Sequence, residues 1–217
     1  MQVLMRRPNA PWLFGLMALA GFGIFGFATS VLMLGPSEVL GTRLSEMTCL
    51  QMAFTPERYS AVFLSFSEPQ REAIVALLVP GDLVFAWGYG FLLSGLLGLL
   101  ALRLPGGWQR WGALIMWSPL LASTFDCIED VFLYTMAQQL VGNPQTTIAA
   151  ALPMLASIAA VLKYIALSVI PPLYGLAGIA KGVFSDRSLT SWLVYILLGL
   201  LLISMLLKPI QDIPACF

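Results

Sequence analysis

The sequence contains no histidine, and this absence excludes whole classes of chemistry. Without an imidazole the chain cannot form a Ser-His-Asp triad, bind haem through histidine or build a histidine-rich di-iron centre. It also lacks the one side chain that ordinarily titrates near neutral pH. Acid–base chemistry is therefore left to the carboxylates, the tyrosines and Lys163.

Charge is scarce and balanced. Charged residues make up 10% of the 217 residues, whereas ordinary soluble domains are about a quarter charged. Eleven Lys and Arg residues face eleven Asp and Glu residues, which argues against a basic nucleic-acid footprint, so we expect no nucleic-acid partner. The hydrophobic fraction of 59% is more than one soluble core of this length absorbs, and it favours a surface in contact with lipid.

Cysteine is rare, and the chain carries no convincing cofactor motif. Cys49, Cys127 and Cys216 are scattered and contain no CxxC pair. This pattern matches neither a disulfide framework nor a zinc site, so we expect three ordinary thiols. The run Gly21–Gly26 formally matches GxGxxG but follows no strand, so we expect helix packing there and no nicotinamide cofactor.

Long apolar stretches predict the fold. A membrane-spanning helix needs about 20 largely apolar residues, since the hydrocarbon layer is about 30 Å thick. The sequence predicts an all-α, polytopic transmembrane helix bundle, with residues 1–217 forming a single transmembrane domain of about five spans. The predicted spans are residues 12–34, 83–102 with a helical lead-in from 68, 111–140, 147–179 and 191–207.

The distribution of Lys and Arg predicts the orientation. Six basic residues lie before or between the predicted spans on one side, accompanied only by Asp186, while acids outnumber bases on the other side. Cytoplasmic loops carry the excess of Lys and Arg, so the amino terminus is predicted to be cytoplasmic. The compact loops favour a multi-pass protein of the cell (inner) membrane. The six are Arg6, Arg7, Arg103, Arg110, Lys181 and Arg187.

Residues 35–72 form the longest predicted exterior segment, which is too short to bury a core of its own. Thr55 followed by proline predicts a helix start, and Ser67 with Gln70 predicts a capping box. The apolar residues 62–66 favour a position on the membrane surface or over a cavity. A lid, a partner-binding surface and a plain connector remain open as roles for this segment.

Two proline sites predict irregularities in the long helices. Pro80-Gly81 predicts a kink immediately before Asp82. Pro171-Pro172 predicts a break or bend late in the fourth span.

The third span carries three acids, Asp126, Glu129 and Asp130. A charge at the membrane centre costs roughly 2.5–3.5 kcal/mol on insertion scales, so such residues normally face protein and serve a function. At about 100° per residue, Asp130 lies roughly 40° from Asp126, and Glu129 lies roughly 60° away on the other side. This face therefore points into the bundle, because small residues allow close helix approach in lipid. The neighbours that share it are Ala122, Ser123, Leu133 and Ala137.

Helix depth predicts a shared pocket. Lys163 in the fourth span lies near the level of Asp126, which makes this the expected ion pair. Asp82 reaches a depth similar to that of Asp130 if its helix enters the membrane near Ala73, and lies shallower if the helix enters later. We expect the second, third and fourth spans to pack around one polar pocket, with five candidate catalytic residues and four hydrogen-bonding or substrate-binding neighbours. The candidates are Asp82, Asp126, Glu129, Asp130 and Lys163, and the neighbours are Tyr89, Ser123, Tyr134 and Tyr164.

The charge of this pocket does not balance, because Lys163 can neutralise one of four acids. At about 4 Å and an effective dielectric near 20, each like-charge pair costs on the order of 4 kcal/mol. We therefore expect either protonated acids or a bound cation, with a divalent metal on Asp126, Glu129 and Asp130 as one form of it.

Three functions fit these features. The first is a site that binds or transforms a lipid-like or cationic substrate, such as an isoprenoid, sterol or lipid precursor. The second is a small proton- or cation-coupled transporter. The third is a non-catalytic subunit or assembly factor of a membrane complex. Membrane lipids are the expected partners, and self-association and a place in a larger complex both remain open.

Overall fold

The computed structural model describes residues 8–104, 106–185, 199–200, 202–204, 207 and 216. Across these residues the regular structure is entirely helical, with no strand. This structure confirms the predicted all-α class. Four helices are long and apolar enough to cross a membrane, which indicates a membrane protein. They are Ala10–Leu32, Glu68–Arg103, Gly107–Gly142 and Ala151–Lys181. The predicted fifth span, 191–207, falls largely outside the described residues.

The four long helices are each built from consecutive segments, in which η marks a short π or 3₁₀ turn. The first consists of α2 (Ala10–Phe27) and η1 (Ala28–Leu32). The second consists of α6 (Glu68–Ala76), η3 (Leu77–Asp82) and α7 (Leu83–Arg103). The third consists of α8 (Gly107–Ile115) and α9 (Ser118–Gly142). The fourth consists of α10 (Ala151–Tyr164), η4 (Ile165–Val169) and α11 (Ile170–Ser185).

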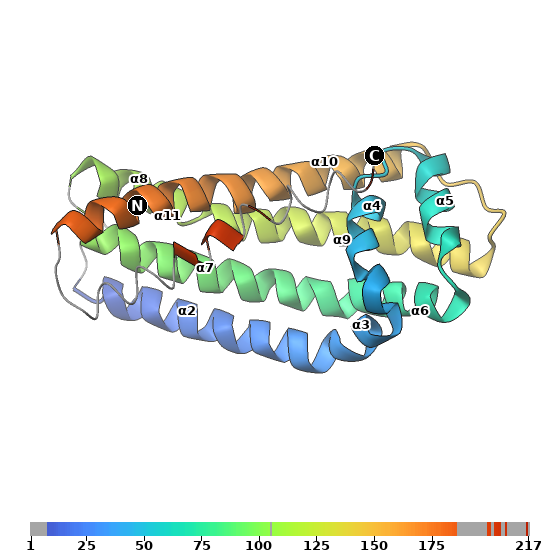
Figure 1. Cartoon of the computed structure of the whole chain (residues 1–217), viewed down its shortest axis with the longest axis horizontal. Coiled ribbons are helices and arrows are strands. Elements are labelled where there is room, and N and C mark those ends of the chain that lie inside the picture. The colour runs from blue at the N-terminus through green and yellow to red at the C-terminus, as the bar shows by residue number, and fades with distance from the viewer. Residues whose placement is uncertain are drawn as a thin grey trace.

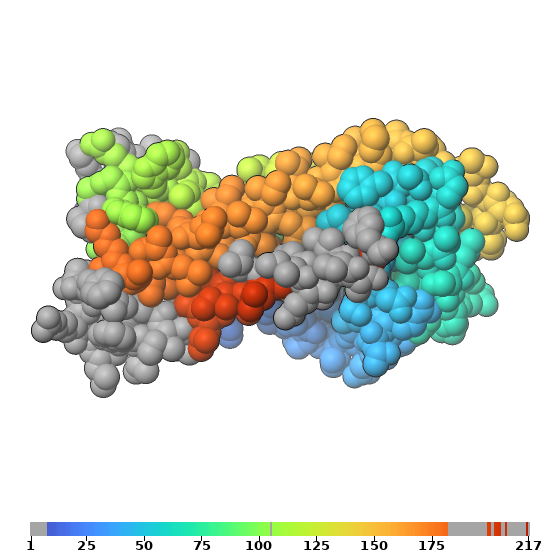
Figure 2. Space-filling model, turned by 45° about the horizontal axis from the view of Figure 1, so that its top comes forward, coloured from blue at the N-terminus to red at the C-terminus, as the bar shows by residue number. Residues whose placement is uncertain are grey.

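Short helices cover one end of this bundle. They are α3 (Leu34–Leu40), η2 (Gly41–Glu46), α4 (Met47–Gln51) and α5 (Pro56–Ser65). Figure 1 shows the long helices side by side, with α3 to α5 packed across one end and α8 at the other. In Figure 2 the same short helices form a closed block in blue and teal, while α8 in green lies beside α11 in orange. We call residues 34–65 the cap.

The closest helix pair, α2 with α7, packs through glycine. A Cβ on Gly21 would lie 2.1 Å from the backbone nitrogen of Leu92, and one on Gly88 would lie 2.6 Å from that of Phe25. Without side chains at these positions the two backbones can touch, as small residues commonly allow in lipid. A Cβ on Gly23 would meet nothing within 4 Å. The glycine run therefore contributes helix packing, through Gly21 in particular.

The predicted start signals are confirmed. The Thr55 hydroxyl accepts a hydrogen bond from the backbone N–H of Arg58 at the start of α5. The backbone N–H of Ser67 donates to Oε1 of Gln70 at 3.1 Å, within the capping box that opens α6. The expected kink is also present, since Val79 has φ −137° and ψ 118° immediately before Pro80.

Two long helices differ in detail from the prediction. The third has a turn at Met116 and Trp117, and α9 begins anew with Pro119 in its first turn, where the missing N–H costs nothing. In the fourth, the chain stays helical through Pro171-Pro172. The wider π turn of η4 lies immediately before these prolines, where their missing N–H groups leave carbonyls without helical partners.

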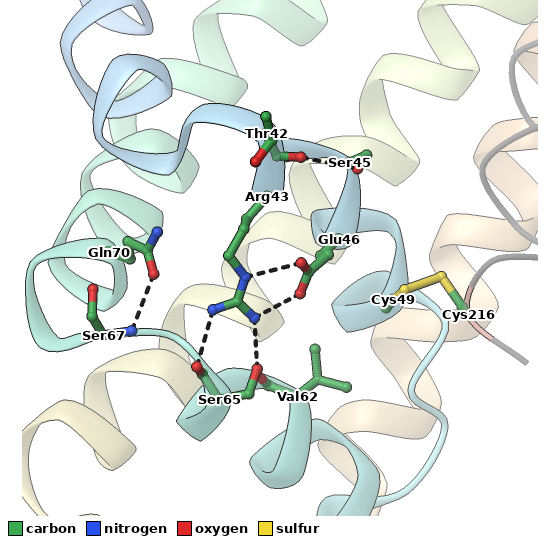
Figure 3. A network of polar contacts seen from close by, with 10 residues as sticks. All are labelled: Thr42, Arg43, Ser45, Glu46, Cys49, Val62, Ser65, Ser67, Gln70 and Cys216. Atoms are coloured by element: carbon green, nitrogen blue, oxygen red, sulfur yellow. Dashed lines mark hydrogen bonds and ion pairs between the residues drawn. A yellow bond between two sulfur atoms is a disulfide. The ribbon is translucent and has the colours of Figure 1, made fainter.

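One sequence prediction was wrong: the cysteines are not three free thiols. Cys49 of α4 and Cys216 form a disulfide with their Cα atoms 5.0 Å apart, and Cys127 remains free. Figure 3 shows this bridge beside the side chains that hold the cap together. The 167 residues between the two cysteines hid the pairing, because only the tertiary fold brings α4 next to the last residues of the chain.

A short polar network fastens η2 to α5 within the cap. The Arg43 guanidinium donates to both carboxylate oxygens of Glu46, at 2.9 and 2.7 Å. It also donates to the backbone carbonyl and the hydroxyl of Ser65 (Figure 3). These hydrogen bonds hold the Glu46 carboxylate in its charged form and keep its pKa below the ordinary range.

The cap shares its core with the bundle instead of burying one alone. Tyr59, Phe63 and Phe66 are fully buried in one cluster with Leu133 and Met136 of α9. The apolar residues of α5 thus cover the ends of the long helices. This arrangement places the cap against the part of α9 that follows the acids.

Candidate functional site

The three acids of α9 lie on its buried face. Asp126, Glu129 and Asp130 have exposed fractions of 4%, 0% and 0%. The small and apolar residues predicted to share this face, Ala122, Ser123, Leu133 and Ala137, are buried as well. The helical periodicity of α9 therefore predicted the inward face correctly.

Lys163 of α10 is the cation of this site. Its Nζ donates a hydrogen bond to Oδ1 of Asp126 at 2.7 Å, which confirms the predicted pair. The same Nζ lies 2.7 Å from Oε2 of Glu129, as an ion pair whose angles do not fit a hydrogen bond. One ammonium is thus shared between two carboxylates, a division that helix depth alone did not predict.

Tyr89 of α7 completes the surroundings of Asp126. Its hydroxyl donates to Oδ2 of Asp126 at 2.7 Å, so both oxygens of this carboxylate have partners. Gly90 allows the approach, because a Cβ there would lie 2.1 Å from the Ser123 hydroxyl of α9. That hydroxyl donates to the Ala86 carbonyl at 2.6 Å and ties α9 to α7.

Asp82 brings a fourth carboxylate to the site from the start of α7. The kink at Val79 lies three residues before Asp82 and changes the direction of the helix. One oxygen each of Asp82, Asp126 and Asp130 lies within 4.8 Å of the other two. Asp82 is half-buried, in contrast to the two acids of α9.

Asp130 lacks the support that Asp126 has. Both of its carboxylate oxygens, and Oε1 of Glu129, have no hydrogen-bond partner within the described part of the chain. At 4.8 Å and an effective dielectric of about 20, two carboxylates repel each other by roughly 3.5 kcal/mol. A group of three ionised aspartates is therefore not stable by itself, and a proton or a cation has to lower its charge.

No family model, curated protein or solved structure matches this chain. Its function can therefore be inferred only from the chemistry of its own residues.

The other predicted neighbours divide between the site and its surroundings. The Tyr164 hydroxyl donates to Oε1 of Gln51 at 3.0 Å, away from the acids. Its ring centroid lies 5.2 Å from Lys163 Nζ, close enough for a cation–π contact. The Ser123 hydroxyl bonds backbone carbonyls of α7 and α9. Tyr134 packs against the cluster under the cap. Their proposed roles toward a substrate stay predictions.

The cap closes the site from one end, through residues that the sequence did not single out. Gln51 of α4 is buried and accepts the Tyr164 hydrogen bond. The backbone N–H of Phe54 donates to the Ser157 hydroxyl on α10 at 3.0 Å. The Tyr59 hydroxyl donates to the Leu133 carbonyl on α9. Each contact joins segments that are far apart in the sequence, so no local sequence pattern could have predicted it.

An open groove lies elsewhere, at the α8 end of the bundle. It has a volume of about 670 Å³ and an almost wholly apolar lining, which includes Trp111, Leu173 and Tyr174. None of the four acids lines it. Among the described residues, the groove is thus separate from the charged site.

The charged site can act in two ways. As a proton site, its surplus carboxylates would take up and release protons. As a cation site, Asp82, Asp126 and Asp130 would supply the oxygens, because these three converge. Glu129, which the sequence placed in the metal set, is instead engaged with Lys163.

Proposed function

We propose that this chain is a multi-pass protein of the cell (inner) membrane that binds a cationic ligand, or the cationic part of a lipid-like substrate, among α7, α9 and α10. One observation carries the proposal. Lys163 is shared by Asp126 and Glu129, while the buried Asp130 has no hydrogen-bond partner in the described residues. The three carboxylates of α9 thus meet one ammonium, which leaves a surplus of two negative charges if all three are ionised.

The position of the site favours a function over a scaffold. The four long helices expose large apolar side chains such as Trp12, Leu19 and Leu173, as a lipid-facing surface would. Acids placed between such helices are expensive in a bilayer, and they normally mark a path or a site for a ligand.

Two features support the orientation with the cap outside the cell. Arg103 ends α7, Arg110 lies in α8 and Lys181 lies near the end of α11. In Figure 1, α8 and the end of α11 lie opposite the cap, and the positive-inside rule expects such basic residues at a cytoplasmic end. The Cys49–Cys216 disulfide lies at the cap, and disulfides persist mainly in oxidising compartments outside the cytoplasm.

A fifth crossing is supported by three described points. Ser185 ends α11 at the α8 end (Figure 1), and Cys216 lies at the cap. Between them in sequence, Leu202 is helical and fully buried, with its side chain against Gly175 of α11. An odd number of crossings places the two chain ends on opposite sides.

The test is native mass spectrometry of protein purified gently in lipid nanodiscs, combined with elemental analysis. Wild-type protein should carry one bound cation, either a metal ion or an organic cation, and Asp130→Asn should lose it. Glu38→Gln, which changes an exposed carboxylate of α3, should keep it. The proposal fails if wild-type protein binds no cationic species of either kind, or if Asp130→Asn binds it equally well.

A second candidate function rests on the buried Asp126–Lys163 pair itself, which would fasten α9 to α10 in a non-catalytic subunit of a membrane complex. Co-purification of a stoichiometric foreign subunit with wild-type protein and with Asp130→Asn alike would select this role. Recovery of the chain alone would reject it.

A further inference from the structure

Three aspartates from two different helices converge in this bundle. Asp82 opens α7, and Asp126 and Asp130 lie one turn apart on α9. One oxygen of each lies within 4.8 Å of the other two. Two ligand atoms on opposite sides of a calcium ion, with bonds of about 2.4 Å, are also about 4.8 Å apart. The three oxygens therefore lie close enough together for small side-chain rotations to bring them onto one ion.

A second observation points to a missing ligand. Asp130 is fully buried, and neither of its oxygens has a hydrogen-bond partner in the part of the chain described. Buried carboxylates are normally hydrogen-bonded or paired. Asp126 meets this expectation through Tyr89 and Lys163. Asp130 does not, and one of its oxygens lies within 4.8 Å of an oxygen of each of the other two aspartates.

We infer that the ligand of this site is a divalent metal ion of the oxygen-binding class, such as Mg²⁺, Ca²⁺ or Mn²⁺, held by Asp82, Asp126 and Asp130. This inference rests on the proposed function and names its ligand. Carboxylate oxygens are the donors that these hard cations prefer, whereas soft metals take thiolate or imidazole. The chain has no histidine, and the free Cys127 is not part of the converging group.

The charge of the site selects a divalent over a monovalent ion. The three ionised acids of α9 and Lys163 sum to −3 + 1 = −2. A monovalent ion leaves −1, and a divalent ion leaves no net charge on these four groups. A single divalent ion thus removes most of the repulsion among the acids, while Lys163 stays with Asp126 and Glu129.

The geometry also assigns a different part to Glu129. Its Oε2 is paired with Lys163, and it is not among the three carboxylates that converge. Glu129 is therefore a partner of the ammonium and not a metal ligand. Lys163 and Tyr89 act as positioning residues, because they hold both oxygens of Asp126 in place through hydrogen bonds.

The experiment is a titration with Mn²⁺, followed by electron paramagnetic resonance, of the full chain in nanodiscs of zwitterionic lipid. These lipids lack the net charge that would bind the ion nonspecifically. Wild-type protein should bind one Mn²⁺ per chain, and Mg²⁺ or Ca²⁺ should compete. Asp82→Asn and Asp130→Asn should each weaken binding at least tenfold. The exposed-site control Glu38→Gln should stay within threefold of wild type.

A measurement on wild-type protein removes any dependence on how the variants fold. Chain labelled with ¹³C at the aspartate side-chain carboxyl should show carboxylate ¹³C couplings to the bound Mn²⁺ by electron–nuclear double resonance. Absence of these couplings, or unchanged affinity in both aspartate variants, overturns the metal assignment. An organic or monovalent cation lost in Asp130→Asn, without divalent binding, also overturns it but leaves the proposed function standing.

Discussion

The ammonium of Lys163 and the carboxylate of Asp126 lie 2.7 Å apart, and neither is open to solvent. The two residues are 37 positions apart and belong to α10 and α9. Because Lys163 also faces Glu129, this one cation decides how many of the surrounding acids have a partner. Asp130 is left without one in the described residues, and the proposed cation site follows from that shortage.

Removal of the Lys163 ammonium should destabilise the bundle. Lys163→Met leaves Asp126 and Glu129 buried without their shared partner, and breaking a buried pair in this way typically costs about 3–5 kcal/mol. Asp126→Asn alone should also destabilise, while the double change should recover part of the loss. Equilibrium unfolding in mixed micelles measures these differences. Lys181→Met, an exposed change on α11, is the control, and strictly additive effects would contradict the coupling.

The Tyr89 hydroxyl should matter more than that of Tyr134. Tyr89→Phe removes the hydrogen bond to Asp126, and a hydrogen bond to a charged group is worth about 1.5–3 kcal/mol. Tyr134→Phe removes a hydroxyl with no hydrogen bond among the described residues and should have little effect. The same unfolding measurement compares the two variants. Equal losses would show that the Tyr89 contact does not position Asp126.

Two glycines of α2 should respond in opposite ways. Gly21→Ala forces a methyl group against the backbone of Leu92, and such overpacking costs about 1–3 kcal/mol. Gly23→Ala meets nothing and should be neutral or stabilise by up to about 1 kcal/mol, since Ala favours helix over Gly. Thermal unfolding of both variants provides the comparison. If Gly21→Ala were as stable as wild type, α2 and α7 would not pack backbone to backbone.

The disulfide should stabilise the cap end of the molecule. Cys49→Ser or reduction should lower stability by about 2–4 kcal/mol, because the bridge closes a long loop in the unfolded chain. Cys127→Ser should cause no such loss of stability, since that cysteine forms no disulfide. Thiol alkylation of the denatured, unreduced protein, read by mass spectrometry, should modify one cysteine. Three modified cysteines would contradict the bridge.

The cap should weaken slightly in acid. The hydrogen bond from Arg43 lowers the pKa of Glu46, so the stabilisation it gives is complete above the ordinary Glu pKa of about 4.3 and fades as the pH falls through the lower folded value. Both side chains are partly exposed, and screening holds the effect below about 1 kcal/mol. The loss between pH 6 and pH 3 should be smaller in Glu46→Gln, with Glu57→Gln as the control. Identical pH profiles would show that the pair contributes nothing.

Much of the fold and part of the site follow from local sequence. The cap residue Thr55 and the Ser67–Gln70 box mark helix starts because they satisfy N–H groups that lie within one turn. The 3.6-residue period places Asp126, Glu129 and Asp130 on one face, and the inward side of that face follows from its small neighbours. Counting residues along each helix was enough to match Lys163 with Asp126, because rise per residue is fixed.

The sequence by itself therefore determined the long apolar helices, the buried face of α9 that carries the acids, and the surplus of acid over base. Only the tertiary structure decided which acids meet. Lys163 takes Glu129 as a second partner, Asp82 joins Asp126 and Asp130, and Cys49 pairs with Cys216. The physical reason is that periodicity fixes a residue on its own helix, whereas contacts depend on how each helix is rotated and how closely it approaches its neighbour. Here that approach is set by Gly90 against Ser123 and by the break at Val79.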